Sequence, residues 1–287
     1  MKKKIFAVSD IHGHYNELRK CLDKAKFDEN NESHLLVVCG DIFDRGEQSL
    51  ELYNYLRELK DKGKAILVAG NHDKFMPDFL DGHSCAFNFL YNGFNKTLDS
   101  FLNETSSYQT FLLYINEFKE EAVRIYGDRV KPLLGDPSAI PSEVLFDVYE
   151  EYARDYIKRE YKDLYEFLSD LPYYYETENY IFTHASIDTE CEDWKNPTFT
   201  KYEDWSPWYY LTWDNGSFFG KEIKNTDKTV VVGHYHTDGI REKYSIETDF
   251  GSNSILRRDD NKVIMIDACT PLTRRVNVLI IDDEDLL

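Results

Sequence analysis

Three apolar runs near the start of the chain have the length of buried β-strands, and a polar cluster follows each of them directly. The runs are residues 5–9, 35–39 and 66–69. The segments between them, about 14–26 and 48–60, carry apolar residues at helical spacing. This alternation predicts βαβ units. The polar clusters then share the carboxyl edge of one sheet, where α/β proteins bind ligands.

The polar clusters supply side chains suited to a site for two metal ions. Asp10 and His12 lie two residues apart at a predicted strand end, where a bend can turn both toward one ion. Asp41 ends the neighbouring strand and can bridge two ions through its two carboxylate oxygens. Three further ligands come from later clusters: Asn71, His184 and His234.

The ligand types and their number predict the chemistry of this site. A mixture of carboxylate, amide oxygen and imidazole suits manganese, iron or zinc better than magnesium or calcium, and we expect Mn²⁺. Two ions ~3.5–4 Å apart would bind phosphoryl oxygens and lower the pKa of a bridging water. The predicted reaction is therefore direct hydrolysis of a phosphoester by a metal-bridging hydroxide.

Three further residues predict how the leaving group and the phosphate are handled. His72 follows the ligand Asn71 and can face the leaving-group oxygen as a general acid. Asp44 can hold its imidazole protonated and oriented. Arg45 offers a planar fork that matches phosphate oxygens, and we expect Arg45 and Asn71 to bind substrate.

Bulk composition limits the partners and the location. The chain has 34 basic and 53 acidic residues, a formal charge of −19, which argues against a nucleic-acid-binding surface. Bound metal ions would still make one cleft attractive to phosphate.

Five widely spaced cysteines without a C-x-x-C pair predict neither a disulfide framework nor a cysteine zinc site. No apolar segment approaches the ~20 residues of a membrane span. We expect a cytoplasmic protein that does not contact membranes.

The middle of the chain has a different pattern. Long aromatic-rich helical stretches replace the strands over residues 74–170, with apolar stripes over 111–125 and 144–164. We predict a helical insertion there, between catalytic segments 1–73 and 171–287. The insertion either caps the site or is purely structural. Strands return at 180–183, 229–232, 262–266 and 275–281, and an irregular aromatic loop over 191–219 is expected near the site mouth.

The clusters resemble those of the calcineurin-like metallophosphoesterase superfamily, and within it the serine/threonine phosphoprotein phosphatase branch of bacterial and phage type. The branch-specific similarity is Gly40-Asp41-Ile42-Phe43-Asp44-Arg45-Gly46. The segment from Leu171-Pro172 to Thr183-His184-Ala185 and the closing Ile266-Asp267-Ala268 also resemble that branch. The resemblance covers residues 3–73 and 168–282 in pieces and leaves the insertion unexplained.

The resemblance implies an α/β (α+β) four-layer fold with a central β-sandwich flanked by helices. It implies Asp10, His12 and Asp41 on one ion and Asp41, Asn71, His184 and His234 on the other. It assigns His72 with Asp44 as the acid pair and Arg45 to phosphate. In other superfamily members the second His of Gly-His-x-His ligates the first metal, which makes His236 a further candidate ligand.

The chain departs from the branch at three positions. Asn215 stands near the place of a second phosphate-binding Arg, for which Arg241, Arg257 and Arg258 are the candidate substitutes, while Ser186 and Cys269 replace expected glycines.

We expect a serine/threonine protein phosphatase-like phosphomonoesterase acting on phosphorylated protein, peptide or a small phosphoester. The alternatives are a symmetrical dinucleoside tetraphosphate hydrolase or another nucleotide phosphohydrolase, a phosphodiesterase or nuclease, and a catalytically idle interaction module. The sequence does not predict an oligomeric state.

Overall fold

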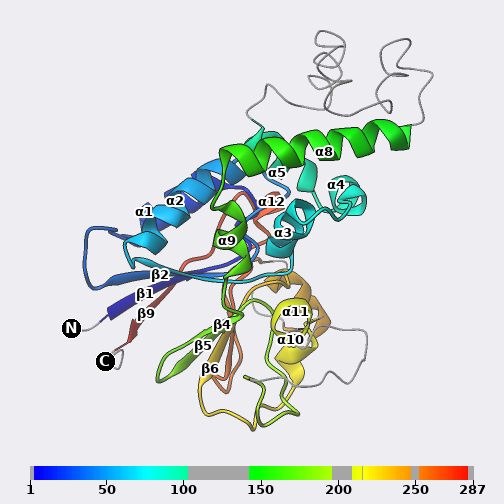
Figure 1. Ribbon diagram of the computed structural model, residues 1–287. Helices are drawn as coiled ribbons and strands as arrows, with labels where there is room; N and C mark the ends of the chain where they lie inside the picture. Colours follow the sequence, from blue (N-terminus) through cyan, green and yellow to red (C-terminus); the bar gives the residue numbers. More distant parts are fainter. Residues whose placement is uncertain (1–2, 103–141, 196–208, 215, 247–251, 284–287) are drawn as a thin grey trace, which may run out of the picture.

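Two β-sheets lie face to face at the centre of the molecule, with helices on their outer sides (Figure 1). The computed structural model describes residues 3–102, 142–195, 209–214, 216–246 and 252–283. Within those ranges no helix combines the length and the apolar character needed to cross a bilayer.

The first sheet is built from the start of the chain and closed by its end. Its strand order is β3-β2-β1-β9, with β1, β2 and β3 parallel and β9 antiparallel to β1. The predicted helices α1 and α2 connect the three parallel strands, so the predicted βαβ units are confirmed. Their bounds are β1 Lys3–Val8, α1 Tyr15–Ala25, β2 His34–Cys39, α2 Ser49–Asp61, β3 Ala65–Val68 and β9 Leu279–Asp283.

The second sheet has the order β4-β5-β6-β8-β7. Its central strands β5, β6 and β8 are parallel, and the short strands at its two edges are antiparallel to their neighbours. The edge strands β4 and β7 were missed from the sequence, because two or three residues give no alternating pattern. The strand predicted over 275–281 begins only at Leu279, after α12. The bounds are β4 Tyr174–Glu176, β5 Tyr180–Thr183, β6 Thr229–Val232, β7 Leu256–Arg257, β8 Val263–Met265 and α12 Thr270–Thr273.

Alternation along the strands produces three apolar layers. On β1, Phe6 and Val8 face the helices while Ile5 and Ala7 face the second sheet. On β6, Val231 faces the first sheet, and its neighbours along the strand pack against the helices on the other side. Because side chains alternate with a period of two, each strand contributes to two layers. The predicted four-layer sandwich is confirmed.

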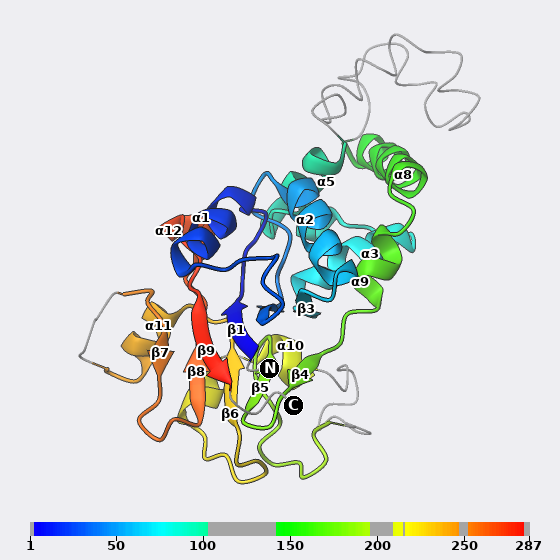
Figure 2. The same ribbon diagram turned by 90° about the vertical axis from the view of Figure 1, so that its left-hand side faces the viewer.

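Helices cover both outer faces. α10 and α11 lie beside the second sheet, whereas α1 and α2 cover the first (Figures 1 and 2). The aromatic segment predicted to be an irregular loop includes the short helix α10. The bounds are α10 Tyr209–Trp213, the 3₁₀ turn η4 Ser217–Gly220 and α11 Thr237–Lys243.

The helices of the predicted insertion pack beside α2 (Figure 2). Their buried side chains join the same apolar cluster as α1, α2 and the outer face of β1. The predicted stripe over 111–125 lies outside the described residues, and the division of the chain at 74 and 170 remains a prediction. The bounds are the 3₁₀ turn η1 His72–Lys74, α3 Phe75–Leu80, α4 Ala86–Tyr91, α5 Phe94–Phe101, α8 Ser142–Glu160 and α9 Leu164–Ser169.

One buried ring tests how much this packing contributes to stability. Phe101 of α5 is fully buried, and its ring centroid lies 5.6 Å from that of Phe43 and 5.1 Å from that of Tyr161. We expect Phe101→Ala to lower the free energy of unfolding by about 3–5 kcal/mol, measured by chemical denaturation, because a cavity replaces the ring. Phe87→Ala, at a side chain that is 67% exposed, is the control and should change it by less than about 0.5 kcal/mol. Equal effects would contradict the packing argument.

Candidate metal centre

The site residues at the strand ends have an unusual backbone. Left-handed φ values occur in the turns after β1, β2 and β6, where non-glycine residues pay of order 1 kcal/mol or more for this conformation. Strain of this kind clusters at functional sites, since surrounding structure must hold it in place. The residues concerned are Asp10, His12, Asp41, Asp44, Arg45 and His234, with φ between 49° and 72°.

Asp73 holds two of these turns together. Its Oδ2 accepts the backbone N–H groups of Asp41 at 2.9 Å and Gly70 at 2.8 Å, and its Oδ1 accepts that of Ile42 at 2.9 Å. Burial and the nearby Asp41 raise the pKa of Asp73 to about 6. This carboxylate fixes the loop after β2 against the loop after β3. The sequence contains Asp73 within a polar cluster, but its role was missed.

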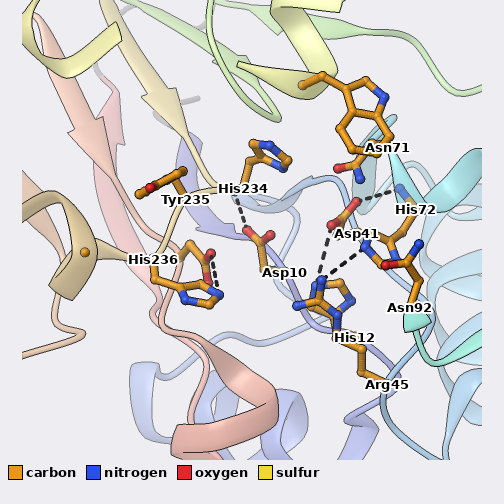
Figure 3. Close-up of a pocket in the computed structure, with 13 residues that line it drawn as sticks. Asp10, His12, Asp41, Arg45, Asn71, His72, Asn92, His234, Tyr235 and His236 are labelled. Carbon is orange, nitrogen blue, oxygen red and sulfur yellow. Dashed lines mark hydrogen bonds and ion pairs between the residues drawn. The ribbon is translucent and has the colours of Figure 1, made fainter. Parts of the chain in front are cut away.

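The turns surround a cavity of about 470 Å³ at the edge of both sheets. Figure 3 shows His12, Asp41 and His72 together on one side, with Asp10 and His234 next to them. The clusters after β1, β2 and β3 lie at the edge of one sheet, as expected, and the histidines after β5 and β6 reach the site from the second. The cavity is lined by Asp10, His12, Asp41, Arg45, Asn71, His72, Asn92, Trp213, His234, Tyr235, His236, Gly239 and Asp267.

On one side of Asp41, His12 presents a free imidazole nitrogen. Asp41 Oδ2 lies 3.5 Å from His12 Nε2. His12 Nδ1 lies 2.9 Å from the carbonyl oxygen of Phe43, which can only accept, so Nδ1 carries the proton and Nε2 keeps its lone pair. Burial lowers the pKa of His12 well below its ordinary value, which keeps the ring neutral. A neutral, oriented imidazole is the form that binds metal.

On the other side of Asp41, His184 is oriented in the same way. Asp41 Oδ1 lies 3.3 Å from His184 Nε2, and His184 Nδ1 donates to the carbonyl oxygen of Cys39 at 2.9 Å. His184 Nε2 is also 3.0 Å from Asn71 Oδ1 and 3.1 Å from His234 Nδ1. Burial lowers the pKa of His234 to about 3.

This arrangement fits cations. With its proton on Nδ1, His184 directs an acceptor at the carboxylate of Asp41 and the amide oxygen of Asn71, so lone pairs meet unless a positive charge lies between them. The two oxygens of Asp41 face two different imidazole groups, as a ligand shared by two ions would. Burial opposes ionisation of Asp41, but the imidazoles around it hold its pKa well below the ordinary value.

Two further predicted ligands, Asp10 and His236, line the cavity but do not belong to the two groups of closely spaced ligand atoms around Asp41. Asp10 is buried, and its Oδ2 accepts the backbone N–H of His234 at 2.9 Å. His236 is partly exposed, and its Nε2 lies 3.8 Å from Oδ2 of the buried Asp267. Burial raises the pKa of Asp10 and of Asp267, and the two carboxylates repel each other. The roles of Asp10 and His236 remain predictions.

The acid pair predicted from the sequence is in hydrogen-bond contact. Asp44 Oδ2 lies 2.7 Å from His72 Nδ1, and both side chains are buried. Burial opposes protonation of His72, but Asp41 and Asp44 outweigh it and raise its pKa. An Arg45 N–H donates to His72 Nε2 at 3.2 Å, so the other ring nitrogen faces the cavity as an acceptor and can carry a proton only when the guanidinium group moves away from it. His72 also lies close enough to His12 and Asp41 to be a ligand on distance alone.

The arginines considered as substitutes for a second phosphate-binding group are not in the cavity, so that expectation is wrong. Arg241 donates to backbone carbonyls, including that of Ser252 at 3.0 Å. Arg258 is bonded to Asp260 and to the carbonyl oxygen of Phe219. Arg257 is not among the lining residues. The side chains of Arg241 and Arg258 are engaged elsewhere, and Arg45 is the one Lys or Arg that lines the cavity in the described ranges.

The structure describes two of the three positions at which the chain departs from the family pattern, Ser186 and Cys269. Ser186 donates its hydroxyl to the carbonyl oxygen of Tyr210 at 2.7 Å. Cys269 adopts a left-handed φ of 53°, the conformation for which glycine is usual. Asn215 lies outside the described residues.

Four lining residues were given no role in the sequence, namely Asn92, Tyr235, Gly239 and Asp267, whereas Trp213 lies in the aromatic segment that was expected near the site mouth. Asn92 comes from the turn between α4 and α5, and the exposed side chains of Trp213 and Tyr235 come from α10 and from the turn after β6. Asp267 carried a signal, since it lies in the closing cluster that resembles the family, and so did Trp213 through its aromatic segment. A single Asn, Tyr or Gly without a spacing pattern gives none.

Comparison with known proteins agrees with this geometry. Residues 3–266 match the family model for calcineurin-like phosphoesterases. A segment of 82 residues is 45% identical to a symmetrical bis(5'-nucleosyl)-tetraphosphatase of Nitrosospira multiformis, and one of 75 residues is 41% identical to that of Aeromonas salmonicida. These matches span 29% and 26% of this chain and 28% and 26% of the relatives, so each covers less than a third of either protein.

The fold has solved counterparts. A mutant of a cold-active protein tyrosine phosphatase aligns with a TM-score of 0.50 at 18% identity, covering 99% of this chain and 76% of that one. At this identity the likeness concerns the fold alone.

Proposed function

Since the chain belongs to the calcineurin-like phosphoesterase family, we propose that its cavity hydrolyses phosphoesters with two divalent ions and His72 as general acid. The observation that carries this proposal is the position of Asp41. One of its oxygens faces His12 and the other faces His184, at the cavity that His72 of the acid pair also lines. The family supports a dinuclear divalent site, and we propose Mn²⁺ from the mixed oxygen and nitrogen donors.

The side chains divide into three roles. Asp10, His12, Asp41, Asn71, His184 and His234 would hold the ions, with His236 as a further candidate. Bound ions would polarise the phosphoryl group and lower the pKa of a coordinated water. Arg45 is exposed in the cavity and would present its guanidinium to a phosphate oxygen of the substrate. His72 Nε2 faces the same space, from which it can protonate the departing oxygen.

For the substrate, we propose a dinucleoside tetraphosphate rather than a phosphoprotein. Trp213 and Tyr235 line the cavity with 44% and 36% of their surfaces exposed, as aromatic rings that stack on a nucleobase would be. Trp213 also lies beside the candidate ligand His234, with 6.1 Å between ring centroids. The curated relatives named above are symmetrical tetraphosphatases. The protein phosphatase expectation, which rests on Asp44-Arg45-Gly46, is the alternative outcome.

A comparison of substrates tests both parts of this proposal, the phosphoesterase activity and the choice of a dinucleotide as substrate. With Mn²⁺ added, we expect faster turnover of diadenosine tetraphosphate, giving two molecules of ADP, than of a phosphoserine peptide. Trp213→Ala should raise KM for the dinucleotide about tenfold, since stacking contributes ~1–3 kcal/mol per base. Tyr165→Ala, an aromatic side chain outside the cavity, is the matched control.

The outcomes distinguish an error in the proposed substrate from an error in the proposed activity. Faster peptide turnover, insensitive to Trp213→Ala, would support a protein phosphatase instead. Absence of metal-stimulated hydrolysis of any phosphoester, including p-nitrophenyl phosphate, would overturn the proposed activity itself.

A further inference from the structure

A threonine from α5 contacts the acid pair from outside the polar clusters. Thr97 is fully buried, and its hydroxyl donates to Asp44 Oδ1 at 2.6 Å. The Thr97 hydroxyl oxygen in turn accepts the backbone N–H of Asp44 at 2.9 Å. Thr97 lies 53 residues along the chain from Asp44, on a helix of the predicted insertion.

The turn before α5 contacts the next residue. Gly93 accepts the backbone N–H of Arg45 at 3.2 Å and has a left-handed φ of 78°. A Cβ at Gly93 would lie 2.5 Å from the Arg45 nitrogen, so the two backbones are as close as glycine permits. The start of α5 is therefore seated on both Asp44 and Arg45.

The hydroxyl of Thr97 completes the hydrogen bonds of a carboxylate that would otherwise be free to turn. The carboxylate torsion of an Asp side chain has broad preferences, so its rotamer alone does not aim the two oxygens. Asp44 is 1% exposed, so water cannot donate hydrogen bonds to its carboxylate oxygens. Thr97 binds Oδ1 and leaves Oδ2 directed at His72 Nδ1.

The direction of the Thr97 bond is set by its surroundings. The hydroxyl has a single proton, and the oxygen also accepts from the Asp44 amide and, at 3.4 Å, from the Ser49 hydroxyl. Both lone pairs are thus engaged, and the proton is left for the carboxylate.

We propose that Thr97 is a positioning residue, which orients the His72 imidazole through Asp44 and so gives the helical insertion a part in catalysis. The inference rests on the proposed acid role of His72. The structural alternative is that Thr97 only fastens the loop after β2 to α5, in which case its loss would affect stability without selecting among substrates.

Substitutions on α5 distinguish the two roles. Thr97→Val removes the hydroxyl at nearly constant volume, and Thr97→Ser retains it. Ser100→Ala is the matched control, because Ser100 accepts the backbone N–H of Leu50 from the same helix without contacting the acid pair. The substrates are p-nitrophenyl phosphate, which has a good leaving group, and O-phosphoserine, which has a poor one, assayed with Mn²⁺ and with bound metal measured.

We expect Thr97→Val to lower kcat for O-phosphoserine about tenfold, a part of the ~10²–10⁴ that a positioned acid contributes. The loss for p-nitrophenyl phosphate should be smaller, bound metal should be unchanged, and Thr97→Ser should restore most of the rate. In a His72→Asn background Thr97→Val should lower kcat no further, since both substitutions act on proton donation by the same imidazole.

Equal losses for the two leaving groups, or a further loss in the His72→Asn background, would overturn the inference. If Thr97→Val does not fold, Thr97→Ala is judged by the same ratio of rates. A failure of the proposed acid role of His72 can be told apart from a failure of this inference. In that case His72→Asn would lower the rates for the two leaving groups equally, whatever the effect of Thr97→Val.

Discussion

Asp41→Asn should lose bound metal and, with it, nearly all phosphoesterase activity. Asp41 is 2% exposed, and its two oxygens lie 3.5 Å from His12 Nε2 and 3.3 Å from His184 Nε2. Asparagine keeps one oxygen and replaces the other with an NH₂ group, which has no lone pair for an ion. It also removes the one negative charge that both halves of the site share.

The size of the effect follows from what the ions contribute. Lewis-acid stabilisation by bound metal is worth several kcal/mol, so turnover should fall by about 10³ or more. Elemental analysis should find less metal per chain than in the unsubstituted protein. Asp163→Asn is the control: Asp163 forms a surface ion pair with Arg57 and should leave both quantities unchanged.

Retention of metal at full stoichiometry in Asp41→Asn would contradict the bridging role. The backbone contact of this residue needs a separate check, because Asp41 Oδ1 also accepts the backbone N–H of His72 at 3.0 Å. An amide oxygen can accept that bond, so circular dichroism should show the variant folded. Loss of metal from a folded protein is then an effect on the site.

The strands of the first sheet and the positions of the candidate ligands at their ends could be predicted from local patterns. Residues 5–9 and 35–39 are apolar on both faces, as strands buried between helices and a second sheet must be. Each candidate ligand follows such a run, so a strand end and a ligand position coincide. The meeting of two sheets could not be derived in this way, because only the resemblance to a known family implied the sandwich.

Contacts between distant segments left no pattern in the sequence. Thr97 reaches Asp44 through the packing of α5 against α2, and neither residue's neighbours indicate the pair. Arg241 and Arg258 show the opposite case. Their position near the last clusters suggested a phosphate contact, but carbonyl groups and Asp260 already satisfy their donors. Charge and proximity along the chain do not give the direction of a side chain.

His72→Asn should keep the metal and lose the ability to protonate a poor leaving group. The imidazole is buried, its Nδ1 is bonded to Asp44 at 2.7 Å, and its Nε2 faces the cavity beside Arg45. The two carboxylates nearby raise its pKa, which favours the protonated form that an acid requires. Asparagine fills much of the same space but has no proton to give at this position.

Turnover of O-phosphoserine should fall by ~10²–10⁴, and that of p-nitrophenyl phosphate by much less, because nitrophenolate leaves without protonation. His83→Asn, at an exposed histidine outside the cavity, is the control and should match the unsubstituted protein.

Two results would contradict the acid role in different ways. Equal loss for both substrates would mean that His72 acts before the leaving group departs. Loss of metal would make His72 a ligand, as its distance to His12 and Asp41 alone allows. The surroundings favour the acid role: Asp44 occupies Nδ1, and the guanidinium group that donates to Nε2 would repel a metal ion there. Protonation of Nε2 then requires Arg45 to give up that bond, as it would on binding phosphate.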